Sequence, residues 1–218
     1  GVSTRLIGMV IMAHGDDKGL NLPPKLAPHQ VVVIPITPNE DSKATVLEAT
    51  QKISEELGKS FRVHVDDRDN ISPGFKFNEW EMKGVPLRME VGPRDVKEQK
   101  VVLARRDEKG KLFIPKDDVL DNVQGFLDGI QLQLITQARD FRDKITHIVK
   151  GYDDFKSIIS KGGFVRCGWD GNSETEAKIK QDTKATIRCI PFDEDPEKLT
   201  CVFTGQKAKH EVIFAKAY

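Results

Sequence analysis

The segment Gln30–Ile36, with the sequence QVVVIPI, constrains the fold most, because it is a continuous run of apolar, mostly β-branched residues. Such a run is typical of a strand that is covered on both faces. After a turn at residues 37–39, an amphipathic helix that ends at Gly58 is expected. Its evidence is the spacing of four, three and four residues between Val46, Thr50, Ile53 and Leu57. A buried strand followed by a helix predicts that an α/β layer begins here.

The alternation of strand and helix continues beyond this first pair. Phe61–Val65 and Val85–Val91 are expected to be strands, and a turn at Lys109-Gly110 joins the expected strand pair Val101–Ala104 and Lys111–Ile114. Such an alternation over about 65 residues is typical of an α/β layer with helices on both faces. The predicted fold class is α/β, with a mixed central sheet flanked by helices.

A helix with clear start and stop signals is expected between two of these strands, from Gly74 to Lys83. Ser72 suits the N-cap, Pro73 suits the first helical position, and Gly84 ends the helix. Phe77 and Glu81 are four residues apart and therefore share one face of this helix.

That face suits an unstacked guanine. An aromatic ring can stack on the base, and a carboxylate can accept hydrogen bonds from the N–H groups of its Watson–Crick edge. The ordinary interpretation, which the pattern alone favours, remains open: Phe77 packs in the core and Glu81 forms a surface ion pair, because aromatic residues at helical spacing are usually core.

Towards the C-terminus, a long helix is expected over Asp117–Val149, followed by a small α+β domain. Its expected helices are Tyr152–Ser160 and one that a capping box opens at Ser173. Its expected strands are Gly163–Cys167, Lys184–Pro191, Leu199–Phe203 and Glu211–Phe214. At the N-terminus, Leu6–Ala13 is expected to form a buried strand or helix.

Charge and composition exclude several functions. The 34 basic and 34 acidic residues cancel, which counts against a simple polycationic nucleic-acid binder but not against a protein that reads a few splayed bases. No apolar run approaches the roughly 20 residues that span a bilayer, so no membrane partner is expected. Three cysteines are too few for a disulfide framework, and a cytoplasmic location is expected.

Catalytic and metal motifs are weak. The sequence lacks a phosphate-binding P-loop and a recognisable Ser-His-Asp arrangement. The HGDD segment at residues 14–17 could bind a metal, although such a turn is more often a solvated loop. The cysteines at 167, 189 and 201 lack the close spacing of zinc ligands. The residues by themselves therefore lead to an α/β protein that could bind RNA.

Two long segments resemble the prolyl-tRNA synthetase family. GVSTRLIGMVIMAHGDDKGLNLPPKLAPHQVVVIPI resembles the end of its catalytic domain, and DDRDNISPGFKFNEWEMKGVPLRMEVGPRD resembles its anticodon-domain motif. The likeness covers essentially the whole chain and suggests the eukaryote-like and archaeal-like type of this class II family. It implies a catalytic-domain remnant and linker at 1–27, an anticodon-binding α/β domain at 28–135 and a zinc-binding-like α+β C-terminal domain at 136–218.

The resemblance also implies roles for particular residues. Proline anticodons end in two guanines, so the site must read guanine edges. By resemblance, Phe77 stacks on an anticodon base, Glu81 and Asp95 accept hydrogen bonds from guanine, and Arg88 and Arg94 contact bases or phosphates. Arginine donors can reach guanine O6 and N7, which complements the carboxylates.

For the full-length protein, the resemblance implies a proline–tRNA ligase that uses ATP and Mg²⁺ and forms a homodimer in the cytoplasm. Arg5 matches an arginine that binds ATP phosphates, where its cation would stabilise charge on the α-phosphate. Most of the catalytic domain has no counterpart here, so the chain is expected to be a fragment that is inactive in catalysis and binds no cofactor. Its expected partner is tRNA(Pro), with neither DNA nor a membrane.

The C-terminal domain departs from the family pattern. Relatives often hold zinc there with four cysteines, of which Cys167 and Cys201 match one in each pair. Their expected partners are replaced, near Gly171-Asn172 and at Phe203-Thr204, so no metal is expected. Tyr218 resembles the terminal tyrosine whose carboxylate points towards the catalytic domain, although a frayed terminus is as consistent with the sequence. The alternative function is a non-catalytic RNA- or protein-interaction module that reuses the anticodon-binding fold.

Overall fold

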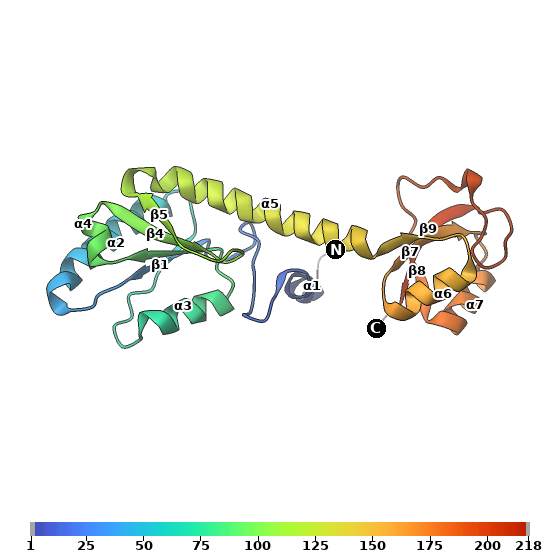
Figure 1. Ribbon diagram of the computed structural model, residues 1–218, viewed down its shortest axis with the longest axis horizontal. Coiled ribbons are helices and arrows are strands. Elements are labelled where there is room, and N and C mark those ends of the chain that lie inside the picture. The colour runs from blue at the N-terminus through green and yellow to red at the C-terminus, as the bar shows by residue number, and fades with distance from the viewer. Residues whose placement is uncertain (1–2, 217–218) are drawn as a thin grey trace. The chain divides into compact units, whose positions relative to one another are not determined.

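The computed structural model describes residues 3–216 and divides into two compact units, Gly1–Ala138 and Arg139–Tyr218 (Figure 1). In the described residues, each unit is built on one mixed sheet with helices packed against it. The α/β fold class expected from the sequence is therefore confirmed. The domain limits expected at 28–135 and 136–218 stay predictions. Among the described residues, no helix is long and apolar enough to cross a membrane.

The first unit contains a five-stranded sheet in the order β2-β1-β3-β4-β5. β1 pairs in parallel with β2 and β3, whereas β4 and β5 are antiparallel to their neighbours. All the strands expected in this unit are present, and their bounds are Val31–Pro35 (β1), Val63–Val65 (β2), Leu87–Val91 (β3), Lys100–Arg105 (β4) and Leu112–Pro115 (β5).

Successive residues of β1 point to opposite faces of the sheet, and helices cover both faces there. Val31 and Val33 join the core formed with α2 (Glu40–Gly58) and α5 (Val119–Ile145). Val32 and Ile34 pack on the other face against Trp80 of α3 (Pro73–Met82). Figure 1 shows α5 and α3 on opposite sides of the sheet. Within the run expected to be covered on both faces, β1 is therefore fully buried, whereas Gln30 and Ile36 at its ends are partly buried.

The ends of α3 follow the expected signals. Ser72 is the N-cap, and its hydroxyl accepts a hydrogen bond from the Phe75 N–H at 3.3 Å. Gly84 follows the helix with φ +73°, a conformation that favours glycine, and the backbone of Leu20 passes close to it. A short helix that the sequence did not predict, α4 (Pro93–Lys97), leads from β3 to β4, and the 3₁₀ helix η1 (Lys116–Asp118) precedes α5.

The expectation that Leu6–Ala13 is buried is wrong. This segment lies in the helix α1 (Arg5–His14), which has no buried residue, and Ile7 and Met12 are largely exposed. Apolar composition predicted burial, but burial also needs a neighbouring surface to pack against. None of the described residues buries this helix.

The second unit contains a four-stranded sheet in the order β6-β7-β9-β8. Its core centres on Phe155 of α6 and Phe214 of β9, whose rings meet edge to face at 5.3 Å between centroids. The bounds are Thr146–Ile148 (β6), Tyr152–Lys161 (α6), Phe164–Trp169 (β7), Ser173–Thr183 (α7), Ala185–Cys189 (β8), Pro196–Lys198 (the 3₁₀ helix η2) and His210–Lys216 (β9).

Three expectations for this region are wrong in detail. The long helix ends at Ile145, because the next residues pair in parallel with β7 as β6. The N-cap of α7 is Asn172, since the helix already begins at the residue expected to cap it. Residues 199–203 form turns and isolated bridges instead of a strand, because the chain reverses at Gly205, whose N–H donates back to the Cys201 carbonyl at 2.9 Å.

Candidate nucleic-acid interface

Phe77 lies half-buried on the side of α3 that faces the sheet. Its ring packs against the cluster formed by Val32, Ile34, Trp80 and Val85. The guanidinium carbon of Arg88 lies 4.3 Å from the ring centroid, and the Lys111 ammonium lies 5.4 Å from it. The ring therefore contributes to packing and also lies beside two cations.

Glu81 lies one turn further along α3, and its side chain is partly exposed. Its carboxylate accepts a hydrogen bond from the Lys18 ammonium at 2.7 Å. The ion pair expected under the ordinary interpretation is therefore present. The same carboxylate also lines a cavity, so the ion pair and a ligand-binding role compete for one group.

Arg88 and Lys111 are held in place by a buried carboxylate, Glu90, whose side chain is 4% exposed. Arg88 donates to Glu90 Oε1 from Nε and Nη2, both at 3.2 Å, and Lys111 Nζ donates to Oε2 at 2.5 Å. Glu90 faces the same side of β3 as Arg88, two residues away. This carboxylate therefore fixes both cations beside the ring of Phe77.

A cavity of about 370 Å³ opens between α3, the sheet and the β4–β5 turn. Glu81 and Glu108 are the acidic residues among its described lining, whereas the basic ones are Lys18, Arg88, Arg105, Arg106, Lys109 and Lys111. The apolar side of the lining includes Trp80 and Val85. An excess of cations beside an apolar wall suits a flat ligand that carries negative charge.

The position of α3 depends on Asp66, whose side chain is 1% exposed at the end of β2. Its carboxylate accepts two hydrogen bonds from Arg68 at 2.7 Å and one from the Trp80 indole N–H at 2.8 Å. The buried Lys76 ammonium donates to the Asp66 carbonyl at 3.0 Å. The hydrogen bonds from Arg68 are the main reason that the pKa of Asp66 lies well below its usual range.

Asp95 and Arg94 lie apart from Phe77, Glu81 and Arg88. They belong to α4, beyond the C-terminal end of β3, which lies about 10 Å along the strand from Arg88 at the usual rise per residue. Asp95 Oδ2 accepts a hydrogen bond from the Gly92 N–H at 2.9 Å, and Arg94 is exposed. The five expected anticodon residues therefore form two groups, one near each end of β3.

Sequence reasoning missed Glu90, Lys111, Lys18 and Asp66. The polar residues at alternate positions of the expected strand, Arg88 and Glu90, were a usable signal for Glu90. No comparable signal existed for Lys111 or Lys18, because they reach the site only when the β4–β5 hairpin and the loop after α1 fold back.

The remaining predicted residues are not brought to this site. Arg5 begins α1 and is exposed, and Tyr218 lies outside the described residues. One arginine does not form a nucleotide or Mg²⁺ site, so no step through ATP follows from the described residues.

Cys167 and Cys201 lie in the second unit, where both are buried. Burial raises the pKa of the Cys167 thiol to about 12. Near the expected partner positions, Asn172 caps α7 and the Thr204 hydroxyl donates to Asp170 at 3.3 Å. Over residues 3–216, no group of three or more metal-ligating side chains is found. The residues present therefore do not fit a four-ligand zinc site.

Two family models match separate segments of the chain, one in each unit. The family model described as "Anticodon binding domain" matches residues 30–125, and the one described as "Prolyl-tRNA synthetase, C-terminal" matches residues 152–218. The first match contains both groups of expected anticodon residues, the one around Glu81 and the α4 segment around Asp95.

Curated relatives match the chain from end to end. Proteins named "Proline--tRNA ligase" from Roseiflexus sp. (strain RS-1) and Alkaliphilus oremlandii (strain OhILAs) are each 48% identical over all of this chain. One from Salinibacter ruber (strain DSM 13855 / M31) is 46% identical, also over the whole chain. The chain spans 45–46% of the length of these relatives.

Proposed function

The chain belongs to the prolyl-tRNA synthetase family, in which it carries the anticodon-binding domain and the C-terminal domain, and we propose that its first unit reads the two guanines of the tRNA(Pro) anticodon. One observation carries this proposal. Within the segment that matches the anticodon-binding domain, the Trp80 ring, the Glu81 carboxylate and several cations line one cavity of about 370 Å³, and the Phe77 ring packs against one of these cations, Arg88.

The first guanine binds at Glu81 and Phe77. The N1–H and N2–H groups of guanine replace the Lys18 ammonium on the Glu81 carboxylate, and Lys18 then faces a phosphate. Arg88 already lies over the ring of Phe77, so its planar guanidinium can stack on the base or donate to O6 and N7. Glu90 holds Arg88 in place and limits the entropy lost on binding.

The second guanine binds beyond the C-terminal end of β3. Asp95 uses Oδ2 to hold the Gly92 N–H, which leaves Oδ1 free to accept from a guanine edge. The exposed Arg94 lies next to it and supplies a donor to the base or to a phosphate. Two carboxylates near opposite ends of one strand therefore serve two adjacent guanines of an unstacked anticodon.

For the longer protein we propose ATP-dependent attachment of proline to tRNA(Pro), with Mg²⁺, in a cytoplasmic homodimer of the eukaryote-like and archaeal-like type. The family and the residue matches support this proposal, since Arg5 corresponds to the arginine that binds ATP phosphates. We propose that the second unit folds without zinc, and its continuous apolar core around Phe155 and Phe214 supports this.

The test measures binding of the chain to a tRNA(Pro) anticodon stem-loop at fixed near-physiological salt, with each guanine replaced in turn by inosine. Inosine lacks the N2 amino group, so each replacement removes one donor. We expect Glu81→Gln to weaken binding about 5- to 100-fold, as for loss of a good bidentate base contact, and to lose discrimination at one guanine. Asp95→Asn should lose discrimination at the other.

The matched control is Glu79→Gln on the same helix, whose carboxylate pairs with Arg68 and Lys83 outside the cavity. This variant should retain the full preference for guanine. If the unsubstituted chain binds guanine and inosine loops equally, or binds neither, the first unit does not read the anticodon in this way. That result would return the non-catalytic interaction module to consideration.

A further inference from the structure

Phe113 lies on the same face of the first sheet as the candidate site. Its neighbour Ile114 points into the core shared with α2 and α5, so Phe113 points to the opposite face, which carries Arg88 and Glu90. α3 packs on β1 at this face, whereas Phe113 on β5 is 62% exposed. A large aromatic side chain is therefore left open on the sheet face that carries the candidate site.

The strand register places Phe113 close to the residues of the site. Glu90 on β3 is opposite Val102 on β4, and Val102 is opposite Phe113 on β5. Two strand spacings separate Glu90 from Phe113, or about 10 Å. Lys111 lies on the same face two residues before Phe113, and it contacts both Glu90 and the ring of Phe77. Lys111 therefore lies between the two phenylalanines.

Cations accompany Phe113 as they accompany Phe77. The Lys100 ammonium lies 5.0 Å from the centroid of the Phe113 ring and also pairs with the Glu98 carboxylate. The two rings differ in access, because Phe77 is half-buried beneath Arg88 whereas Phe113 faces solvent. An exposed ring beside an ammonium group fits a nucleobase and its phosphate, since every base offers a stacking face and every phosphate a negative charge.

We propose that Phe113 is a second stacking platform, which binds the base next to the anticodon guanines while Lys100 and Lys111 contact the adjoining phosphates. The proposal deepens the proposed function and rests on it. The occupant is the same RNA strand, because this surface is continuous with the cavity and carries the complementary charge. Stacking tolerates any base, so this platform contributes affinity without adding sequence preference.

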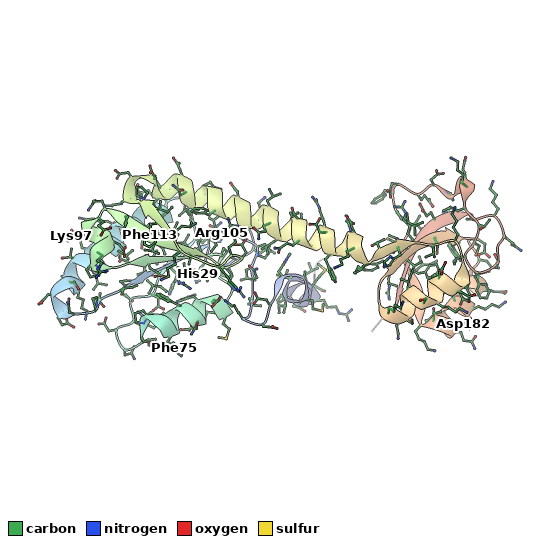
Figure 2. The ribbon with its side chains drawn as sticks, in the orientation of Figure 1. His29, Phe75, Lys97, Arg105, Phe113 and Asp182 are labelled. Atoms are coloured by element: carbon green, nitrogen blue, oxygen red, sulfur yellow. The ribbon has the colours of Figure 1, made fainter. Side chains whose placement is uncertain are left out.

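The test compares Phe113→Leu with Phe75→Leu in binding to the anticodon stem-loop. Phe75 is a matched control because it is 59% exposed in the same unit and lies on the side of α3 that faces away from the sheet (Figure 2). We expect Phe113→Leu to weaken binding about 5- to 30-fold, as for the loss of one stacked base. Phe75→Leu should leave binding unchanged, and Phe113→Trp should restore it.

Abasic nucleotides identify the stacked base. An abasic site at the nucleotide before or after the two guanines should weaken binding by the unsubstituted chain at one of these positions. Binding by Phe113→Leu should not be weakened further by that same abasic site, because the ring and the base are the two partners of one stacking contact. Unchanged unfolding midpoints of both variants confirm that the fold is intact.

The outcomes separate the two proposals. If Phe113→Leu binds as tightly as the unsubstituted chain while Glu81→Gln still loses discrimination of guanine, the platform is overturned and the proposed function stands. If Phe113→Leu and Phe75→Leu weaken binding equally, the effect is not stacking at this site, and the platform is again overturned. Absence of any stem-loop binding by the unsubstituted chain overturns both proposals.

Discussion

The two faces of the first sheet differ although the same strands build them. The face under α2 and α5 is a continuous apolar core that includes Val31, Met89 and Leu103. The α3 face has a small apolar cluster around Trp80, and beside it lie buried and half-buried charges, among them Glu90 and Arg88. Because side chains alternate along each strand, one set of residues can build the fold while the alternate set builds the site.

Substitutions on the two faces should therefore have different effects, on stability at one face and on recognition at the other. Apolar contacts stabilise the α2/α5 face without direction or specificity. The charges on the α3 face stabilise the fold only while each has its partner, since a buried charge without a partner is costly. On the α3 face, substitution of the buried Asp66 should therefore cause a large loss of stability, whereas substitutions around the cavity should mainly weaken binding.

The largest effect on stability is expected from Asp66→Asn, which would remove the buried carboxylate at the centre of the hydrogen bonds on the α3 face. The change leaves the Lys76 ammonium, 5% exposed, without its counter-charge and removes the carboxylate that holds Arg68 and Trp80. We expect the free energy of unfolding to fall by about 3–5 kcal/mol. Urea unfolding followed by Trp80 fluorescence measures this, in a Trp169→Phe background that leaves one tryptophan.

Asp67→Asn is the matched control for that substitution, because Asp67 is the exposed neighbour of Asp66. It should change the unfolding free energy by less than about 0.5 kcal/mol, as is usual for surface positions. A loss in Asp66→Asn no larger than this would mean that the buried carboxylate contributes little and that the α3 face is stabilised by its apolar cluster instead.

The next largest effect on stability is expected from Leu103→Ala, which tests the α2/α5 face. Leu103 is fully buried under α2 and α5, so the substitution removes apolar contacts and leaves a cavity. We expect the free energy of unfolding to fall by about 2–5 kcal/mol. The folded fraction should still prefer guanine over inosine in the stem-loop assay. Loss of that preference would show that the two faces are not independent.

The smallest effect concerns Asp16, which ties the loop after α1 to the α3 face through hydrogen bonds from Arg106 at 2.6 and 2.9 Å. These hydrogen bonds lower the pKa of Asp16 from its ordinary 3.8 to about 2. The contribution to stability is therefore complete above pH 3.8 and is lost as the pH falls towards 2. We expect at most about 1 kcal/mol, because the carboxylate is 47% exposed and water screens it.

The measurement compares urea unfolding at pH 5 and pH 3 for the unsubstituted chain and for Asp16→Asn. The variant should be less stable at pH 5, and its stability should fall less between the two pH values. Asp17→Asn, at an exposed neighbouring position, should retain the pH dependence of the unsubstituted chain. Identical pH dependence in Asp16→Asn would assign the acid sensitivity to other carboxylates.

Local signals predicted most elements of the first unit. The spacing of Val46, Thr50, Ile53 and Leu57 indicated α2, and all four residues are buried. Ser72 and Gly84 marked the limits of α3 because capping and a positive φ depend on a few adjacent residues. The family resemblance could also be found in the sequence, because it rests on the order of residues in long segments, which does not depend on folding.

Local patterns and long matching segments thus predicted the family, most of the strands and helices, and the shared helical face of Phe77 and Glu81. Which groups contact Glu81 and the other site residues depends on the tertiary structure. Lys18 reaches Glu81 from 63 residues away, and Lys111 reaches Glu90 across 21 residues. Secondary structure follows local spacing, whereas the partners of a charge are set by chain reversals and strand register, which a local pattern does not contain. The exposure of α1 and the open ring of Phe113 were decided in the same way, because burial depends on what else packs nearby.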